Sequence, residues 1–137
     1  MTDIELMRLA EEARLMAYAP YSHFLVGAAL LTKDGKVYTG CNIENGAYTP
    51  TNCAERTAFF KAVSEGEREF AAIAIVGGKR GSEPTFCAPC GVCRQVMREF
   101  CEDDFVLYMM GPDGAYEKLT LADILPHSFS AKKHMDA

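Results

Sequence analysis

The fold is decided by residues 71–110. This stretch contains an apolar run at 71–76 (AAIAIV), a helical pattern at 90–100 (CGVCRQVMREF) and a second apolar run at 105–110 (FVLYMM). Continuous apolar runs of this kind are typical of strands whose two faces are both covered. We therefore expect a sheet with helices packed against it.

The residues on either side extend this pattern. The sequence predicts a helix over 3–18, a hairpin of strands 26–32 and 37–43, a helix over 53–65 capped by Asn52 or Thr51, an exposed loop over 77–84, a short strand near Tyr116 and a brief helix over 121–125. Pro89 is expected in the first turn of the 90–100 helix. This order predicts an α/β fold, a three-layer α/β/α sandwich around a mixed five-stranded sheet.

The composition is that of one ordinary globular domain over residues 1–137. Apolar residues make up 49% of the chain, which is enough for a sizeable core. Fourteen Lys and Arg against nineteen Asp and Glu give a net charge of -5, which argues against a nucleic-acid partner. No apolar run approaches the roughly 18 residues that span a bilayer, and the acidic first 20 residues do not resemble a signal peptide. We therefore expect a cytoplasmic protein with no membrane partner.

Cysteines are the unusual feature of the composition. There are six, Cys41, Cys53, Cys87, Cys90, Cys93 and Cys101. In a reducing compartment, cysteines three residues apart indicate metal ligands or a redox pair before disulfides. Cys90 and Cys93 have this spacing at an expected helix start, where free N–H groups and the helix dipole favour thiolates. The spacing alone leaves open a metal pair, a redox dithiol and two cysteines that simply pack.

Cys87 extends the pair toward an iron–sulfur motif without completing it. The bacterial motif needs a fourth cysteine at position 97, where this chain has Met97. Pro89 separates Cys87 from the helix that orients the other two cysteines. We therefore predict that Cys87 is a packing residue, and we predict the same for Cys41 and Cys101.

Cys53 opens another expected helix, and Glu55 follows two residues later. Asn52 and Glu55 have the spacing of a capping box, so these residues by themselves have a purely structural interpretation. Together with Pro89-Cys90-x-x-Cys93 they match the pairing of zinc deaminases, a Cys or His, a Glu two residues on, and P-C-x-x-C. The combination favours a hydrolytic zinc site.

Four stretches resemble the cytidine deaminases of the small, homotetrameric, three-cysteine type. They are YSHFLVGAAL at 21–30, GCNIEN at 40–45, CAERTA at 53–58 and PCGVCRQ at 89–95, with Leu125-Pro126 and Phe129 in agreement. The resemblance implies the cytidine deaminase-like form of the sandwich and one zinc ion per chain. It also implies hydrolysis of cytidine and 2'-deoxycytidine to uridine and 2'-deoxyuridine with release of ammonia, a step of pyrimidine salvage.

The family implies a role for each residue at the zinc. Cys53, Cys90 and Cys93 would be the ligands, and a water or hydroxide in the fourth position would attack C4 of the base. Glu55 would carry protons to N3 and to the departing amine. Because three thiolates leave Zn²⁺ with a net negative charge, Arg56 is expected to donate hydrogen bonds to the ligand sulfurs.

The resemblance also implies the contacts to the nucleoside. Asn42 and Glu44 would bind sugar hydroxyls, Phe24 would pack on the ligand, and the backbone of Ala54 would contact the base. The substrate would then be a free nucleoside, small enough to be held by one set of side chains.

Further contacts would come from other subunits of a homotetramer. Gly46 and Tyr48 would approach from one neighbouring subunit, and Phe129 from another, so that active sites are shared. Two positions depart from the family pattern: Leu25, where relatives often have Pro, and Gly46-Ala47, which replaces a commoner pair of small residues. Both bear on substrate fit or loop rigidity, and neither is a ligand.

Two other functions are compatible with a zinc motif. A deaminase of bases in RNA or DNA would need a basic surface for the strand, which the net charge of -5 disfavours. A non-catalytic, zinc-stabilised interaction domain would not depend on Glu55. Replacement of that carboxylate distinguishes this possibility from an enzyme.

Overall fold

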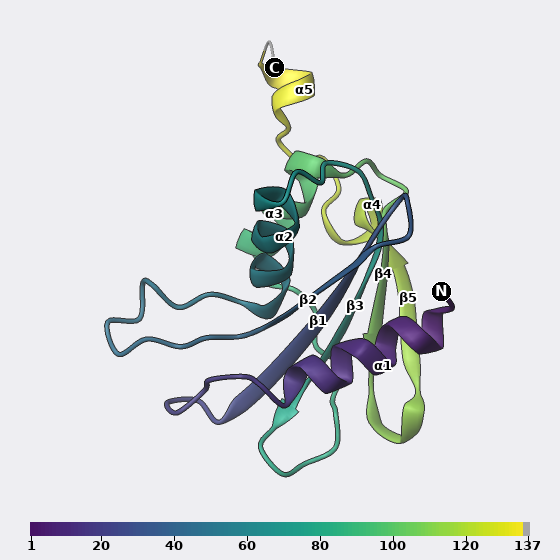
Figure 1. The fold of residues 1–137 in the computed structure, drawn as a ribbon. Helices are drawn as coiled ribbons and strands as arrows, with labels where there is room; N and C mark the ends of the chain where they lie inside the picture. Colours follow the sequence, from purple (N-terminus) through teal and green to yellow (C-terminus); the bar gives the residue numbers. More distant parts are fainter. Residues whose placement is uncertain (136–137) are drawn as a thin grey trace.

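The structure, a computed structural model that describes residues 1–135, is built on one five-stranded sheet (Figure 1). Its strands are β1 (Phe24–Thr32), β2 (Val37–Cys41), β3 (Phe70–Lys79), β4 (Val106–Met110) and β5 (Tyr116–Thr120), in the order β2-β1-β3-β4-β5. Strands β3 and β4 pair in parallel and the other neighbours are antiparallel. The predicted mixed five-stranded sheet is confirmed.

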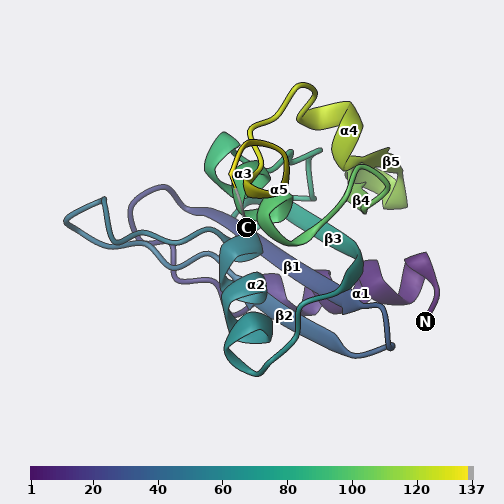
Figure 2. The ribbon, with the colours of Figure 1, turned by 90° about the horizontal axis from the view of Figure 1, so that it is seen from above.

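Helices cover both faces of the sheet (Figures 1 and 2). The helices are α1 (Asp3–Arg14), α2 (Ala54–Ser64), α3 (Gly91–Phe100), α4 (Leu121–Ile124) and α5 (Ala131–His134), with a 3₁₀ turn at Pro112–Gly114. Side chains of β3 alternate between the faces, so that Ala72, Ala74 and Val76 pack toward α1 while Ile73 and Ile75 pack toward α2 and α3. This alternation produces the two cores of an α/β/α sandwich, as predicted. Among the described residues, none of the helices is long and apolar enough to cross a membrane.

The first helix is shorter than its apolar pattern predicts. It ends at Arg14 instead of residue 18, and Leu15 and Met16 are each 78% exposed. The chain leaves the helix because Tyr18 pairs with the segment after β2, where its N–H donates to the Asn42 carbonyl at 3.0 Å. A tertiary hydrogen bond therefore ends the helix before Pro20 does.

The predicted loop over 77–84 was wrong at its start. Gly77, Gly78 and Lys79 continue β3, and both glycines are buried. A Cβ on Gly77 would lie 3.0 Å from Cys87 Sγ and 3.2 Å from the ring of Phe24. Position 77 requires glycine because the side chains of Cys87 and Phe24 pack directly against the strand, on the face covered by α2 and α3.

Two further differences concern helix ends. The prediction of Pro89 in the first turn of α3 was wrong by two positions, because Cys90 has an extended backbone and helical geometry begins at Gly91. Helix α5 was not predicted, since its four residues carry little periodic signal. In Figure 1, α5 projects at the top of the molecule and the segment between β2 and α2 projects to the left.

Candidate functional site

Three cysteine sulfurs meet where α2 and α3 begin. The Sγ atoms of Cys53, Cys90 and Cys93 all lie within 4.8 Å of one another. The Cys53–Cys90 distance is 3.8 Å and the Cys90–Cys93 distance is 3.6 Å. A tetrahedral zinc ion with Zn–S bonds of about 2.3 Å holds its sulfurs about 3.8 Å apart. The spacing of the three sulfurs therefore fits zinc, with a fourth position left for a non-protein ligand.

The helix starts place these sulfurs directly. Cys53 is the N-cap of α2 and Cys90 the N-cap of α3, and neither side chain makes a capping hydrogen bond. Both thiols are thus available to a metal at the positive ends of two helices. Gly40 on β2 allows the close approach of α2, because a Cβ there would lie 2.6 Å from the Ala54 carbonyl oxygen.

The expected capping residues of α2 do not cap it. Cys53 is the N-cap, one residue after the predicted Asn52 and two after Thr51. The side-chain amide of Asn52 instead donates to Thr57 Oγ1 at 3.1 Å. The capping-box interpretation of Glu55 was therefore wrong, and its carboxyl group is not committed to the helix end.

The protonation states of the cysteine thiols indicate how a bound cation would be held. Arg56 donates from Nη2 to Cys53 Sγ at 3.2 Å. Hydrogen bonds from Cys93 and Arg56 lower the pKa of Cys53 to about 5. The pKa of Cys93 is raised, because this thiol donates a hydrogen bond to Cys53 and is buried. One thiolate is thus stabilised by the protein alone, but a second negative charge at this spacing needs a bound cation.

Glu55 lies beside the cluster in a dry environment. Glu55 is only 4% exposed and lies in the first turn of α2. Burial, with a smaller contribution from the neighbouring Cys53 charge, raises the pKa of Glu55 to about 7. A carboxyl group with this pKa can both accept and return a proton near neutral pH.

The other cysteines lie outside the cluster of three. Cys87 packs against the core formed with α2 and α3, and burial raises its pKa to about 11. Cys101 is buried at the end of α3, with its pKa raised to about 12 for the same reason, and burial also raises the pKa of Cys41. Cys87 and Cys101 thus belong to the core, as predicted of packing residues, whereas Cys41 is partly buried on β2 outside both core clusters.

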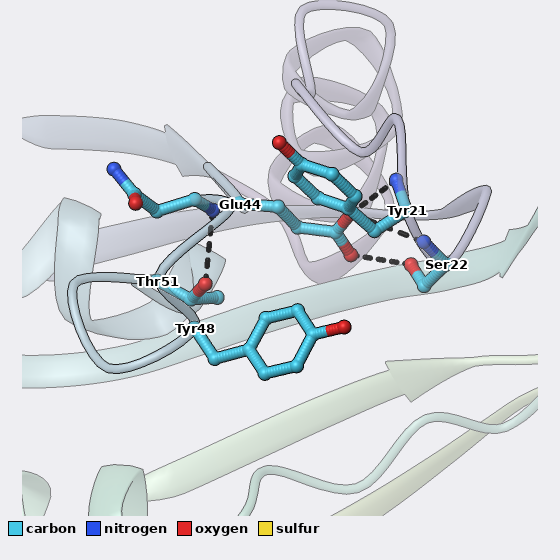
Figure 3. A pocket seen from close by; sticks show the side chains of 6 residues that line it. Tyr21, Ser22, Glu44, Tyr48 and Thr51 are labelled. Atoms are coloured by element: carbon cyan, nitrogen blue, oxygen red, sulfur yellow. Dashed lines mark hydrogen bonds between the residues drawn. The ribbon is translucent and has the colours of Figure 1, made fainter.

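A second feature is an open pocket of about 420 Å³ between residues 21–22 and the segment after β2 (Figure 3). It is lined by Tyr21, Ser22, Glu44, Asn45, Tyr48 and Thr51. The Glu44 carboxylate accepts hydrogen bonds from the N–H groups of Tyr21 and Ser22, at 2.9 and 3.1 Å, and from Ser22 Oγ. These hydrogen bonds, the Ser22 hydroxyl first among them, lower the pKa of Glu44.

Asn42 joins the region of this pocket to β1. Its Oδ1 accepts from the N–H of Val26 at 2.9 Å, and its Nδ2 donates to the carbonyl of Phe24 at 2.8 Å. Phe24 lies against Gly77, next to Cys87. Four residues of the pocket, Tyr21, Ser22, Asn45 and Thr51, were not predicted as site residues, although Tyr21 and Ser22 open the YSHF stretch.

The remaining predicted contact residues are distributed over three places. Ala54 is fully buried as the first residue of α2. Gly46 and Tyr48 lie beside Tyr21 of the same chain, and Tyr48 is 74% exposed with a φ of 65°. Phe129 does not line the pocket of Glu44. It is 55% exposed in the C-terminal segment, stacks on His134 at 5.1 Å, and its carbonyl accepts from Gln95.

Comparison with known proteins gives consistent results. Residues 1–109 match the family model described as cytidine and deoxycytidylate deaminase zinc-binding region. A cytidine deaminase of Sporosarcina psychrophila is 53% identical over 93% of this chain and 92% of its own, and one of Halalkalibacterium halodurans is 50% identical over 96% of both. A crystal structure of cytidine deaminase from Burkholderia pseudomallei, 48% identical, superimposes with a TM-score of 0.87 over 94% of this chain and all of that one.

Proposed function

The chain belongs to the family of cytidine and deoxycytidylate deaminases with a zinc-binding region, and we propose that it hydrolyses cytidine and 2'-deoxycytidine to the corresponding uridines and ammonia. The observation that carries this proposal is the cluster of Cys53, Cys90 and Cys93, at zinc-binding distances, beside the buried Glu55. Two relatives named cytidine deaminase match the chain over 92% and 96% of their own length.

Each residue of the cluster has a defined task in this chemistry. Cys53, Cys90 and Cys93 would hold Zn²⁺, which supplies Lewis-acid chemistry by making water acidic enough to act as a nucleophile at neutral pH. Glu55 would transfer two protons in turn, the first from the attacking water to ring N3 and the second from the hydroxyl group added at C4 to the departing amine. Arg56 offsets the negative charge of the thiolates through its hydrogen bond to Cys53 Sγ. The Ala54 backbone and the Phe24 ring would orient the base.

Hydrogen-bonding capacity indicates how the sugar is held. A carboxylate has about four acceptor positions, and Glu44 already uses three of them. Asn42 uses one lone pair of Oδ1 and one N–H of Nδ2. We propose that one sugar hydroxyl accepts from the second Asn42 N–H and donates to the fourth acceptor position of Glu44. We assign this to the 3'-hydroxyl, the ring hydroxyl that cytidine and 2'-deoxycytidine share.

The experiment is a comparison of three nucleosides by absorbance and ammonia release. Cytidine and 2'-deoxycytidine are expected to react with kcat/KM values within about threefold of each other. 3'-Deoxycytidine is expected to lose roughly 10–100-fold in kcat/KM, because one hydrogen bond to a charged group is absent. If the zinc-loaded protein leaves cytidine unchanged, the proposed function is wrong. Equal loss for 2'- and 3'-deoxycytidine would contradict the assignment of the hydroxyl.

A free nucleoside is a better substrate for this site than a nucleic-acid strand. The pocket holds the Glu44 carboxylate, and the chain has a net charge of -5. Phosphate groups along a strand would meet negative charge both at the pocket and over the whole protein.

We also propose that active sites are shared in a homotetramer. Phe129 is exposed on a C-terminal segment, and Tyr48 is held in a left-handed conformation that L-residues adopt at a cost of about 1–3 kcal/mol. Strain of this kind is typical of residues placed for binding, and Gly46 lies beside Tyr48 in the same loop.

Mixing two defective variants tests the shared site. Glu55→Gln supplies an intact Phe129, and Phe129→Ala supplies an intact Glu55. After the two are exchanged into mixed oligomers, we expect more activity than the average of the separate preparations. Light scattering of the wild type should give a mass near four times the 15.1 kDa of one chain. A mass of one chain, or activity equal to the average, would contradict the shared site.

We propose two further properties of the whole chain, its organisation as one domain and its location in the cytoplasm. The chain is one deaminase domain, since a single sheet organises both cores of the described residues 1–135. A cytoplasmic location is supported by six cysteines that are all free, three of them needed as thiolates.

A further inference from the structure

We propose that Ser22 is a positioning residue that holds the Glu44 carboxylate and the start of β1 in one geometry, and thereby sets how strongly the sugar hydroxyl is recognised. The proposal rests on the proposed function, in which Glu44 binds that hydroxyl. Ser22 is not among the residues predicted to touch the substrate.

A single hydroxyl group connects the pocket residue Glu44 to Phe24 at the start of β1. Ser22 Oγ donates to Glu44 Oε2 and accepts from the N–H of Phe24 at 3.0 Å. Glu44 is the expected sugar ligand, and Phe24 the expected ring contact. The position of one therefore depends on the position of the other through Ser22. Figure 3 shows the hydrogen bond between Ser22 and Glu44.

The hydroxyl removes a rotation that the backbone contacts alone allow. The N–H groups of Tyr21 and Ser22 both bond to Oε1 of Glu44, so they hold one oxygen of the carboxylate. The terminal torsion of Glu is broad, and Oε2 would otherwise move about this anchor. With Ser22 Oγ bound to Oε2, the remaining acceptor position of the carboxylate points in one direction.

Ser22 is itself held by the fold. It lies in a turn whose next residue, His23, has a φ of 59°. The His23 N–H donates to the Ala19 carbonyl at 3.0 Å, and its carbonyl accepts from Arg80 at 2.8 Å, just beyond β3. The serine is thus fixed to the central sheet, and this makes it suited to orient a group on the projecting segment after β2.

Replacing Ser22 with Ala leaves both partners incomplete. The carboxylate loses its only contact to Oε2 among the described residues, and the N–H of Phe24 loses its acceptor. We expect about a tenfold rise in KM for cytidine, with kcat within about twofold of wild type. Zinc content should remain at one ion per chain, because no zinc ligand contacts Ser22 Oγ.

The readout that separates positioning from folding is the ratio of kcat/KM for cytidine to kcat/KM for 3'-deoxycytidine. In Ser22→Ala this ratio should fall by about tenfold, since the analogue lacks the hydroxyl that Glu44 binds. Ser22→Thr, which keeps a hydroxyl, should retain most of the ratio. Ser64→Ala, which removes an exposed serine hydroxyl at the far end of α2, should leave KM and the ratio unchanged.

The outcomes identify which proposal fails. An equal loss of kcat/KM for both nucleosides in Ser22→Ala leaves their ratio unchanged. This result would overturn the positioning role while the deaminase function stands. A wild-type protein that treats cytidine and 3'-deoxycytidine alike would overturn the roles of both Ser22 and Glu44. Absence of any deamination by the zinc-loaded wild type would overturn the proposed function itself.

Discussion

Replacing Glu55 with Gln is expected to lower kcat for cytidine by roughly 10²–10⁴-fold, the usual contribution of a positioned acid–base group. Gln has nearly the same shape but cannot take up a proton and return it to N3 or to the leaving amine. Because Glu55 is buried and is not a zinc ligand in this arrangement, the variant should keep one zinc ion per chain. Steady-state kinetics with metal analysis of the same sample measures both quantities.

A suitable control is Glu65→Gln. Glu65 is the exposed C-cap of α2, at the opposite end of the helix from the cysteine cluster. This variant removes the same charge and should keep full activity. An unaffected Glu55→Gln protein would contradict the catalytic role of Glu55. A non-catalytic interaction domain held together by zinc would bind zinc and leave cytidine unchanged in wild type and in both variants.

Removal of a cluster cysteine is expected to have the second large effect. Cys53→Ala, Cys90→Ala and Cys93→Ala should each retain less than about 0.1 zinc ion per chain after dialysis, because two thiolates form an incomplete site. Activity should fall to background in all three. Melting temperature should also fall, since zinc ties the starts of α2 and α3 together.

Cys87→Ala is the matched control for these three variants. Its thiol lies near the cluster, but burial keeps it protonated, with a pKa of about 11. We expect full zinc content and a loss of about 1 kcal/mol of stability from the missing buried sulfur. Zinc loss in Cys87→Ala, combined with zinc retention in Cys90→Ala, would show that the ligand set is chosen wrongly.

Local patterns in the sequence were sufficient where local physics decides the structure. The apolar runs at 71–76 and 105–110 became the parallel strands β3 and β4. Strand β3 is buried on both faces as predicted, whereas in β4 buried residues alternate with partly buried ones. The hairpin of β1 and β2 was also predictable from its Asp34-Gly35 turn.

Errors arose where distant segments compete for the same groups. The end of α1 is set by the pairing of Tyr18 with the segment after β2, and the length of β3 by the antiparallel pairing of residues 77–79 with residues 24–26 of β1. The cap of α2 was misassigned because Asn52 bonds to Thr57 instead. None of these contacts has a signature in the residues next to it.

The sequence by itself determined the α/β class, because strand burial depends on residue type and short spacing. It indicated the zinc site through the resemblance to cytidine deaminases, since the spacing of Cys90 and Cys93 alone leaves a redox pair and simple packing open. Only the tertiary structure decided that Cys53 lies 3.8 Å from Cys90, 37 positions later, and that Ser22 bonds to Glu44. The reason is physical: the packing of α2 and α3 on one face of the sheet brings these helix starts together, and the β1 and β2 pairing brings residues 22 and 44 together.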